Sequence, residues 1–251
     1  MNHTNTRLWE VDALRGVAIV MMVIYHLLYD LNYFRVTDTI FTNLFWFYFQ
    51  RVTAGTFLVL VGVSLTLSVD AWRRRGQSER TIYGVLFRRG RRIFGWGLVI
   101  TAATWFFFGW ATAVKFGILH FIGVAIMLAF PFLTLCWTNL ALWIGLSLLG
   151  RALSEITISG PWLLWLGIQP MNHVYVDYFP LIPWFGVVLL GVFLGNMLYT
   201  NGERRYSLPL PVTPFRPLQR LGERSLLLYL IHQPLLFALL APIIWLWRSG
   251  T

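Results

Sequence analysis

The sequence predicts an all-α integral membrane protein, a helical bundle of about seven transmembrane helices in a single domain covering residues 1–251. Hydrophobic residues make up 57% of the chain and charged residues only 12%, which is far from the composition of a soluble domain. Apolar runs long enough to cross a bilayer recur along the chain, and arginines gather in alternate connections between them.

The first apolar run, residues 13–32, is expected to remain in the membrane. It is too long for a cleaved signal, contains the polar Tyr25 and His26, and lacks a small-residue cleavage site. Further spans are predicted at residues 44–68, 91–110, 116–135, 138–154, 180–199 and 224–247. The apolar stretch 156–179, rich in proline and tryptophan, predicts an interfacial or re-entrant segment.

Positive charge predicts the orientation. Eight arginines lie in the connection 70–92 and five in the connection 200–224, whereas the alternate connections hold only Arg35, Lys115 and Arg151. The positive-inside rule then places the N-terminus in the cytoplasm and the C-terminus outside, in agreement with an odd number of spans. Four prolines predict that the second cytoplasmic connection is stiff and extended.

The arginines have two interpretations. The first is topology and contact with anionic lipids. The second is that some of them bind the phosphates of a cytoplasmic donor, because arginine makes bidentate contacts to phosphate. For the second interpretation the candidates are Arg88, Arg89, Arg91 and Arg92.

Several classes of protein are excluded. The single Cys136 rules out an internal disulfide. Walker, dinucleotide-binding and zinc-protease motifs are absent, and no cysteine or histidine spacing is typical of a metal site. The net charge of +10 follows the membrane topology, so it does not indicate nucleic-acid binding. Acidic residues are nearly absent from the spans, which argues against a carboxylate proton relay.

Polar side chains within the spans predict a lined cavity. His26 lies about eleven residues from the cytoplasmic end of the first span, and His232 about eight residues from that of the last. With a rise of about 1.5 Å per residue, the two imidazoles lie within a turn or two of the same depth. His120 is expected about one turn from the outer end of the fourth span. A cavity would supply the partners that such groups lack in hydrocarbon, although a lone histidine is also compatible with simple packing.

Three further groups complete the polar set. Arg51 begins the second span on its outer half, and Asp30 and Asp177 mark the outer rim. Arg15, in the first span, has two interpretations. It either holds a charge of the donor or is a snorkelling anchor paired with Asp12 one turn earlier.

Five motifs resemble known families. Residues 11–19, together with the ten residues between Arg15 and His26, resemble the first-helix signature of the transmembrane acyltransferase superfamily. The other four motifs resemble, more narrowly, the bacterial branch of the heparan-α-glucosaminide N-acetyltransferase family. They are residues 25–31, 116–124, 177–186 and 228–234. Together the five motifs cover nearly the whole chain. Their occurrence in this order is more specific for the family than any single motif is.

The resemblance implies a membrane enzyme that moves an acetyl group from acetyl-CoA, as co-substrate and without a metal, to a sugar amine or hydroxyl. The expected partners are acetyl-CoA, a carbohydrate or other small acceptor, the lipid bilayer and a second copy in a homodimer, and the expected location is the bacterial cytoplasmic (inner) membrane. The chain lacks the large lumenal domain of the lysosomal members. Their active-site histidine has no counterpart in residues 30–40, so heparan is not the expected acceptor.

These considerations assign the site residues. An acceptor that attacks a thioester must lose a proton, and histidine is the usual side chain for that task. His26 is therefore the expected general base or acetyl carrier, with Arg15 beside it, and direct and ping-pong transfer both stay open. Donor binding is assigned to Arg15, Arg88, Arg89, Arg91 and Arg92. Substrate binding is assigned to Tyr25, Asp30, Arg51, His120, Asp177 and His232.

The alternative is a transporter or flippase, for a small solute or a lipid-linked substrate, whose cavity binds without chemistry. Such folds commonly show internal repeats or paired broken helices, and the sequence shows neither.

Overall fold

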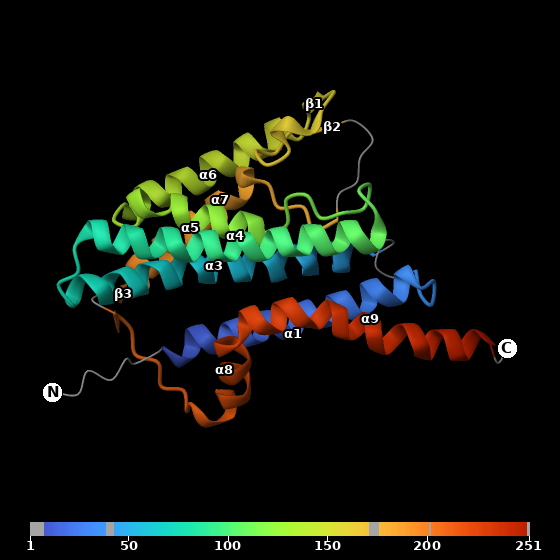
Figure 1. The fold of residues 1–251 in the computed structure, drawn as a ribbon. Helices are drawn as coiled ribbons and strands as arrows, with labels where there is room; N and C mark the ends of the chain where they lie inside the picture. Colours follow the sequence, from blue (N-terminus) through green and yellow to red (C-terminus); the bar gives the residue numbers. More distant parts are fainter. Residues whose placement is uncertain (1–7, 39–42, 171–175, 201, 250–251) are drawn as a thin grey trace. The chain divides into compact units, whose positions relative to one another are not determined.

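The computed structural model describes residues 8–38, 43–170, 176–200 and 202–249. Long α-helices account for most of these residues, so the all-α prediction is confirmed (Figure 1). The chain divides into two compact units, Met1–Leu60 with Leu208–Thr251, and Val61–Ser207. Helix α3 (Leu44–Arg74) passes from the first unit into the second.

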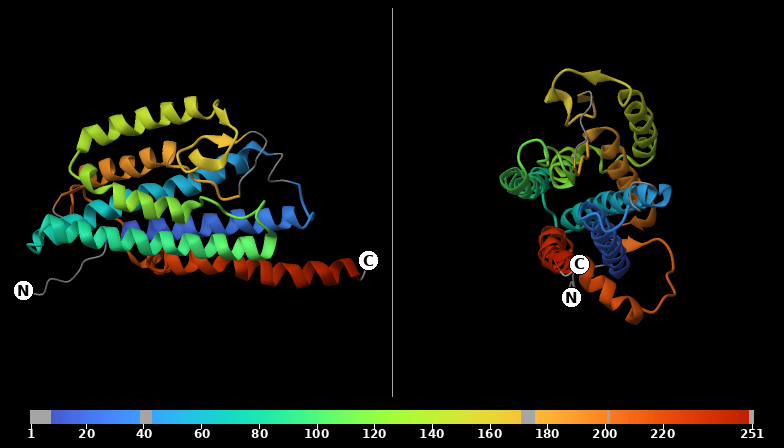
Figure 2. Two further views of the ribbon diagram at one scale, coloured as in Figure 1. Left: turned by 45° about the horizontal axis from the view of Figure 1, so that its top comes forward. Right: turned by 90° about the vertical axis from the view of Figure 1, so that its right-hand side faces the viewer.

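The first unit is built on α1 (Trp9–Tyr33), which packs against α8 (Arg216–Glu223) and α9 (Ser225–Ser249). A 3-10 turn, Thr213–Phe215, precedes α8. Helices α1 and α9 run side by side, as Figures 1 and 2 show. Helix α9 reaches past the end of α1, since Arg248 donates to the carbonyl oxygen of Phe34.

The second unit contains two helix pairs, α4 (Glu79–Phe108) with α5 (Ile118–Leu128), and α6 (Cys136–Leu153) with α7 (Leu181–Leu198). Figure 2 shows both pairs side by side. A 3-10 turn, Phe130–Phe132, follows α5, and a short hairpin of β3 (Tyr199–Thr200) and β4 (Glu203–Arg204) follows α7.

Glycines bring the backbones of α4 and α5 together. A Cβ on Gly90 would come within 2.6 Å of the carbonyl oxygen of Gly123, and a Cβ on Gly123 would come within 2.8 Å of that of Gly90. Close approach through small residues is the usual way in which membrane helices associate.

Six of the seven predicted spans correspond to a helix with similar bounds or a longer one. The exception is 116–135, where the helix is only the 11-residue α5 and a 3-10 turn with Pro131 follows it. Proline lacks the N–H that an α-helix needs at an interior position, which accounts for the break. Among the described residues, four helices are long and apolar enough to cross a membrane, namely α1, α3, α7 and α9.

Helix α4 begins twelve residues before the predicted third span. Ser78 caps it by accepting from the N–H of Thr81 at 3.2 Å, and Glu79 occupies its first turn. An N-cap serine and an early acidic residue both stabilise a helix start, and arginine is a good helix former. Arg80, Arg88, Arg89, Arg91 and Arg92 therefore lie on α4, so the arginine-rich connection predicted over residues 70–92 is helical over most of its length.

The second arginine-rich connection also contains a helix. Pro217 lies in the first turn of α8, where the missing N–H of proline costs nothing. The prediction of a fully extended connection was therefore wrong over residues 216–223.

The segment predicted to lie in the interface or re-enter the bilayer forms short irregular structure where it is described. Strand β1 (Thr157–Ile158) pairs in parallel with β2 (Gln169–Pro170), and a 3-10 turn, Pro161–Leu163, lies between them. Leu181 and Ile182 donate to the carbonyl oxygens of Trp165 and Leu166, which fixes this segment to the start of α7. His173 lies outside the described residues.

Candidate functional site

Two histidines meet between α1 and α9. The ring centroids of His26 and His232 lie 4.8 Å apart at an interplanar angle of 75°. The similar depth that the sequence predicts for them is therefore confirmed. Tyr25 and Tyr229, each on the same helix as its neighbouring histidine, add aromatic contacts to the pair.

Both imidazoles are fixed in the same tautomer. Nδ1 of His26 lies 2.9 Å from the carbonyl oxygen of Met22, and Nδ1 of His232 lies 2.6 Å from that of Tyr229. A carbonyl oxygen only accepts hydrogen bonds, so each Nδ1 carries the proton and each Nε2 presents a lone pair. An imidazole anchored in this way can receive a proton from an attacking nucleophile.

A carboxylate and an amide lie beside the histidines. Asp30 is only 1% exposed, and its Oδ1 accepts from Nε2 of Gln233 at 2.7 Å. The sequence places Asp30 at the outer rim, and the structure packs it against α9 at Gln233. Asp30 follows His26 by one helical turn, so the two side chains share a face of α1.

This cluster contains hydrogen-bond acceptors without donors. Within the described residues, Oδ2 of Asp30, Oε1 of Gln233 and Nε2 of His232 are buried and have no partner. Native proteins rarely leave buried polar atoms unpaired, and each such atom costs free energy. Unpaired atoms at a shared helix interface therefore point to binding or catalysis.

Gln233 is absent from the sequence-based assignment. Its position in the sequence could have indicated it, because Gln233 is a second polar residue directly after His232 inside an apolar run. A buried aspartate in the first span also needs a donor, and an amide on a neighbouring helix supplies one.

Arg15 pairs with Asp12, as the anchor interpretation predicts. Nη1 of Arg15 lies 2.5 Å from Oδ1 of Asp12, and α8 packs against this part of α1 through Gly222. Arg51 belongs to the same unit and lies over the ring of Phe47, with its Cζ 3.6 Å from the ring centroid.

His120 lies in the second unit, and its environment differs from that of the histidine pair. Its Nδ1 accepts from the N–H of Gly117 at 3.2 Å, so its Nε2 carries the proton. Nε2 lies 3.3 Å from Oγ1 of Thr101, whose hydroxyl donates to the carbonyl oxygen of Val114 at 2.6 Å. Both ring nitrogens are therefore engaged, as in a packing histidine, and a role in substrate binding stays a prediction.

Asp177 lies at the start of α5. Its Oδ2 accepts from the N–H of Ile118 at 3.3 Å, where a negative charge also interacts favourably with the helix dipole. The geometry supports a capping role, whereas acceptor binding by Asp177 stays a prediction.

We expect Asp177→Ala to lower the stability of the protein by about 0.5–2 kcal/mol, the usual cost of losing a helix cap. Thermal unfolding in detergent measures this loss. Wild-type stability combined with a raised KM for the acceptor would contradict the capping role and favour substrate binding.

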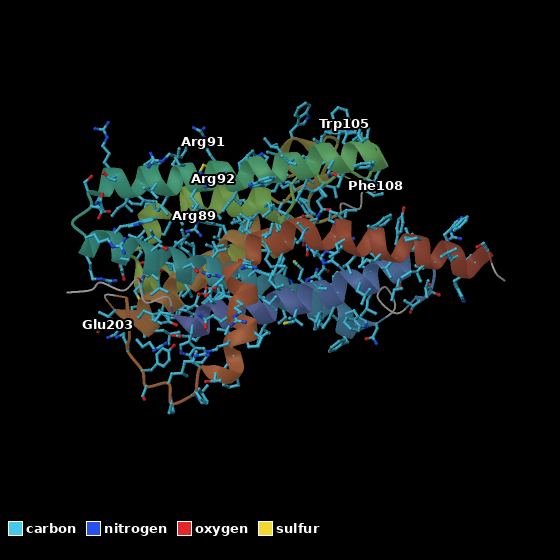
Figure 3. All side chains as sticks on the ribbon, turned by 60° about the horizontal axis from the view of Figure 1, so that its bottom comes forward. Arg89, Arg91, Arg92, Trp105, Phe108 and Glu203 are labelled. Atoms are coloured by element: carbon cyan, nitrogen blue, oxygen red, sulfur yellow. The ribbon has the colours of Figure 1, made fainter. Side chains whose placement is uncertain are left out.

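Four candidate donor-binding arginines, Arg88, Arg89, Arg91 and Arg92, are exposed on the first half of α4. Figure 3 shows Arg89, Arg91 and Arg92 there, and Trp105 and Phe108 towards the other end of the helix. Guanidinium groups on an accessible helix face can bind phosphates. In the part of the chain that the structure describes, no three His, Cys, Asp or Glu side chains are grouped to hold a metal ion.

An all-α fold whose described residues include four apolar helices of spanning length is that of an integral membrane protein. The model of the family described as heparan-alpha-glucosaminide N-acetyltransferase, catalytic, matches residues 7–234. The chain belongs to this family, and membership implies a membrane acetyltransferase. No curated protein and no solved structure matches the chain.

Proposed function

We propose that the protein transfers an acetyl group from acetyl-CoA to the amine or hydroxyl of a sugar or other small acceptor, with His26 as general base or acetyl carrier. The observation that carries this proposal is the contact between His26 and His232, each with Nε2 available as a base. Family membership supports the reaction class.

In direct transfer, Nε2 of His26 removes the proton of the acceptor as the acceptor attacks the thioester carbonyl. A C–N or C–O bond forms, the C–S bond breaks, and the proton passes from the imidazolium to the departing thiolate. In the ping-pong route, Nε2 attacks the thioester carbonyl first, so that an N–C bond forms, the C–S bond breaks and the CoA thiolate departs. The acceptor then attacks the acetylated imidazole, the N–C bond breaks, and the proton of the acceptor passes to the freed Nε2. Hydrogen bonds from both Nδ1 atoms hold the rings in position, which reduces the reorganisation that the reaction requires.

An acetylation assay tests the function. The purified protein in lipid nanodiscs is mixed with acetyl-CoA and, in turn, an amino sugar, a neutral sugar and a simple amine, and the acetylated product is measured by mass spectrometry. Desulfo-CoA and free CoA are the controls without a transferable acetyl group. Binding of acetyl-CoA without product for any acceptor would contradict the proposal and favour a transporter or flippase.

Either the four exposed arginines of α4 or Arg15 on α1 are proposed to bind the phosphates of the donor. Neutralising Arg88, Arg89, Arg91 and Arg92 together is expected to weaken acetyl-CoA binding at least 10-fold, because charge-assisted contacts to phosphate are lost. The wild-type affinity should also fall as salt rises. Calorimetric titration measures both effects. If the affinity for acetyl-CoA is unchanged both in this variant and in Arg15→Ala, the donor phosphates do not bind at these arginines.

We further propose one transmembrane domain over residues 1–251, with about seven spans in a bacterial inner membrane, the N-terminus in the cytoplasm and the C-terminus outside. In a Cys136→Ser background, single cysteines at Ser78 and Ser207 should react with a membrane-impermeant maleimide only after permeabilisation. A cysteine at Ser154 should react in intact cells. Labelling of Ser78 and Ser207 from outside would overturn the orientation.

A further inference from the structure

A recess lies where α3 turns into α4, in the second unit. Its volume is about 260 Å³, and it is lined by Trp72, Arg75, Gln77, Thr81, Ile82 and Val85. The walls thus combine an indole and two aliphatic side chains with a guanidinium, an amide and a hydroxyl. Sites for complete drug-sized ligands are usually about 300–1,000 Å³, so this recess suits one ring system of a larger ligand.

The turn that forms the recess is well fixed. The N–H of Gly76 donates to the carbonyl oxygen of Arg73 at 2.9 Å, and that of Gln77 to the carbonyl oxygen of Trp72 at 3.1 Å. Gly76 has a φ of 72°. These are the two hydrogen bonds and the left-handed glycine of a Schellman motif, which ends a helix sharply.

An ion pair joins the two helices across this turn. Nε and Nη2 of Arg73 donate to the two carboxylate oxygens of Glu79 at 2.8 and 2.9 Å. These two donors hold the pKa of Glu79 below its usual range. Together with the Ser78 cap, this pair fixes the turn beside the recess before any ligand binds, and preorganisation reduces the entropic cost of binding.

The recess continues into the arginine face of α4. Thr81, Val85, Arg88 and Arg92 follow one another at helical spacings of three or four residues, so they lie on one side of the helix. Thr81 and Arg92 are separated by roughly 16 Å along the axis at 1.5 Å per residue. A ligand that places a flat ring in the recess can therefore extend its phosphates along these arginines.

We infer that the recess at the α3–α4 turn binds the adenosine end of the acetyl donor, and that the arginines of α4 receive its phosphates. This inference rests on the proposed function, because acetyl-CoA is the donor assumed there. An aromatic wall stacks against a nucleobase, and the guanidinium of Arg75 suits the ribose phosphate. An anionic lipid headgroup would use the same arginines but has no ring for Trp72 and the aliphatic walls.

Binding of adenosine 3′,5′-bisphosphate to the protein in nanodiscs of neutral lipid tests the inference without any acetyl transfer. We expect Trp72→Leu and Arg75→Gln each to weaken this binding about 10-fold in calorimetric titrations. Arg205→Gln, which removes a charge from the same unit outside the recess, should change it less than 2-fold. Thermal unfolding verifies that each variant is folded.

The competing outcomes are distinct. If Arg75→Gln weakens binding and Trp72→Leu does not, or if inorganic phosphate competes as well as the nucleotide, the site binds phosphate only and the inference is wrong. If phosphatidylglycerol in the nanodiscs abolishes nucleotide binding, the recess is a lipid headgroup site. Absence of binding overturns the inference directly.

The donor itself supplies a second readout. Trp72→Leu should raise the KM for acetyl-CoA about 10-fold but leave the KM for S-acetyl-pantetheine, which lacks the nucleotide, unchanged. An equal change with both donors would overturn the inference. Nucleotide binding that behaves as expected in a protein without acetyl transfer would show that the proposed function fails while the recess remains a nucleotide site.

Discussion

His26→Ala is expected to reduce kcat for acetyl transfer by about 10²–10⁴-fold, the usual effect of losing a positioned acid–base group. The reason is geometric. Nδ1 of His26 is held by the carbonyl oxygen of Met22, so Nε2 is the nitrogen that takes the proton of the acceptor. Steady-state kinetics with acetyl-CoA and any accepted acceptor measures the loss.

Controls separate chemistry from folding. His26→Gln keeps an amide that can donate to the carbonyl oxygen of Met22, but it has no basic nitrogen, so its activity should fall as far as that of His26→Ala. Both variants should retain the melting temperature and the acetyl-CoA affinity of the wild type. A folded His26→Ala protein with nearly wild-type kcat would show that the catalytic assignment is wrong.

His232 would then be the leading candidate, because its Nε2 is buried and unpartnered within the described residues. His120 is a weaker one, since both of its ring nitrogens have partners. Acetylated His26 recovered by mass spectrometry after incubation with acetyl-CoA alone would indicate the ping-pong route. Its absence, together with acetyl transfer in the presence of acceptor, would favour direct transfer.

The sequence predicts most of the helices because their signal is local. Apolar length alone locates six helices, with α3, α7 and α9 starting within one residue of the expected position. The apolar pattern does not, however, show where α4 starts, which is twelve residues before the predicted third span. Counting arginines as loop residues ignores that arginine favours helices and that Ser78 supplies an N-cap.

The site is only partly predictable for a different reason. The depth of His26 and His232 follows from counting residues, so their contact could be expected. The burial of Asp30 depends on how α9 packs against α1, which is a tertiary property. The pairing of Asp30 with Gln233 joins residues 203 positions apart, and no periodicity within one helix indicates it.

The contact between α1 and α8 gives the second large expected effect, because there the backbones of the two helices touch. A Cβ on Gly222 would overlap the carbonyl oxygen of Asp12, and a Cβ on Gly16 would overlap that of Leu218. Backbone atoms cannot move aside as the end of a side chain can. Gly222→Ala should therefore force the helices apart at a cost of about 1–3 kcal/mol, typical of overpacking, and should lower the melting temperature by roughly 2–10 °C.

The matched control is Gly145→Ala in α6, where an added Cβ meets nothing within 4 Å. That change should leave stability the same or raise it by about 0.5–1 kcal/mol, because alanine is the better helix residue. The Cβ of Gly222→Ala would also come within 3.1 Å of the Cβ of Arg15. If Arg15 binds the donor, the α8 variant should lose acetyl-CoA affinity as well as stability. Equal melting temperatures for the Gly222 and Gly145 variants would show that α1 and α8 do not pack in this way, since the clash involves backbone on both sides.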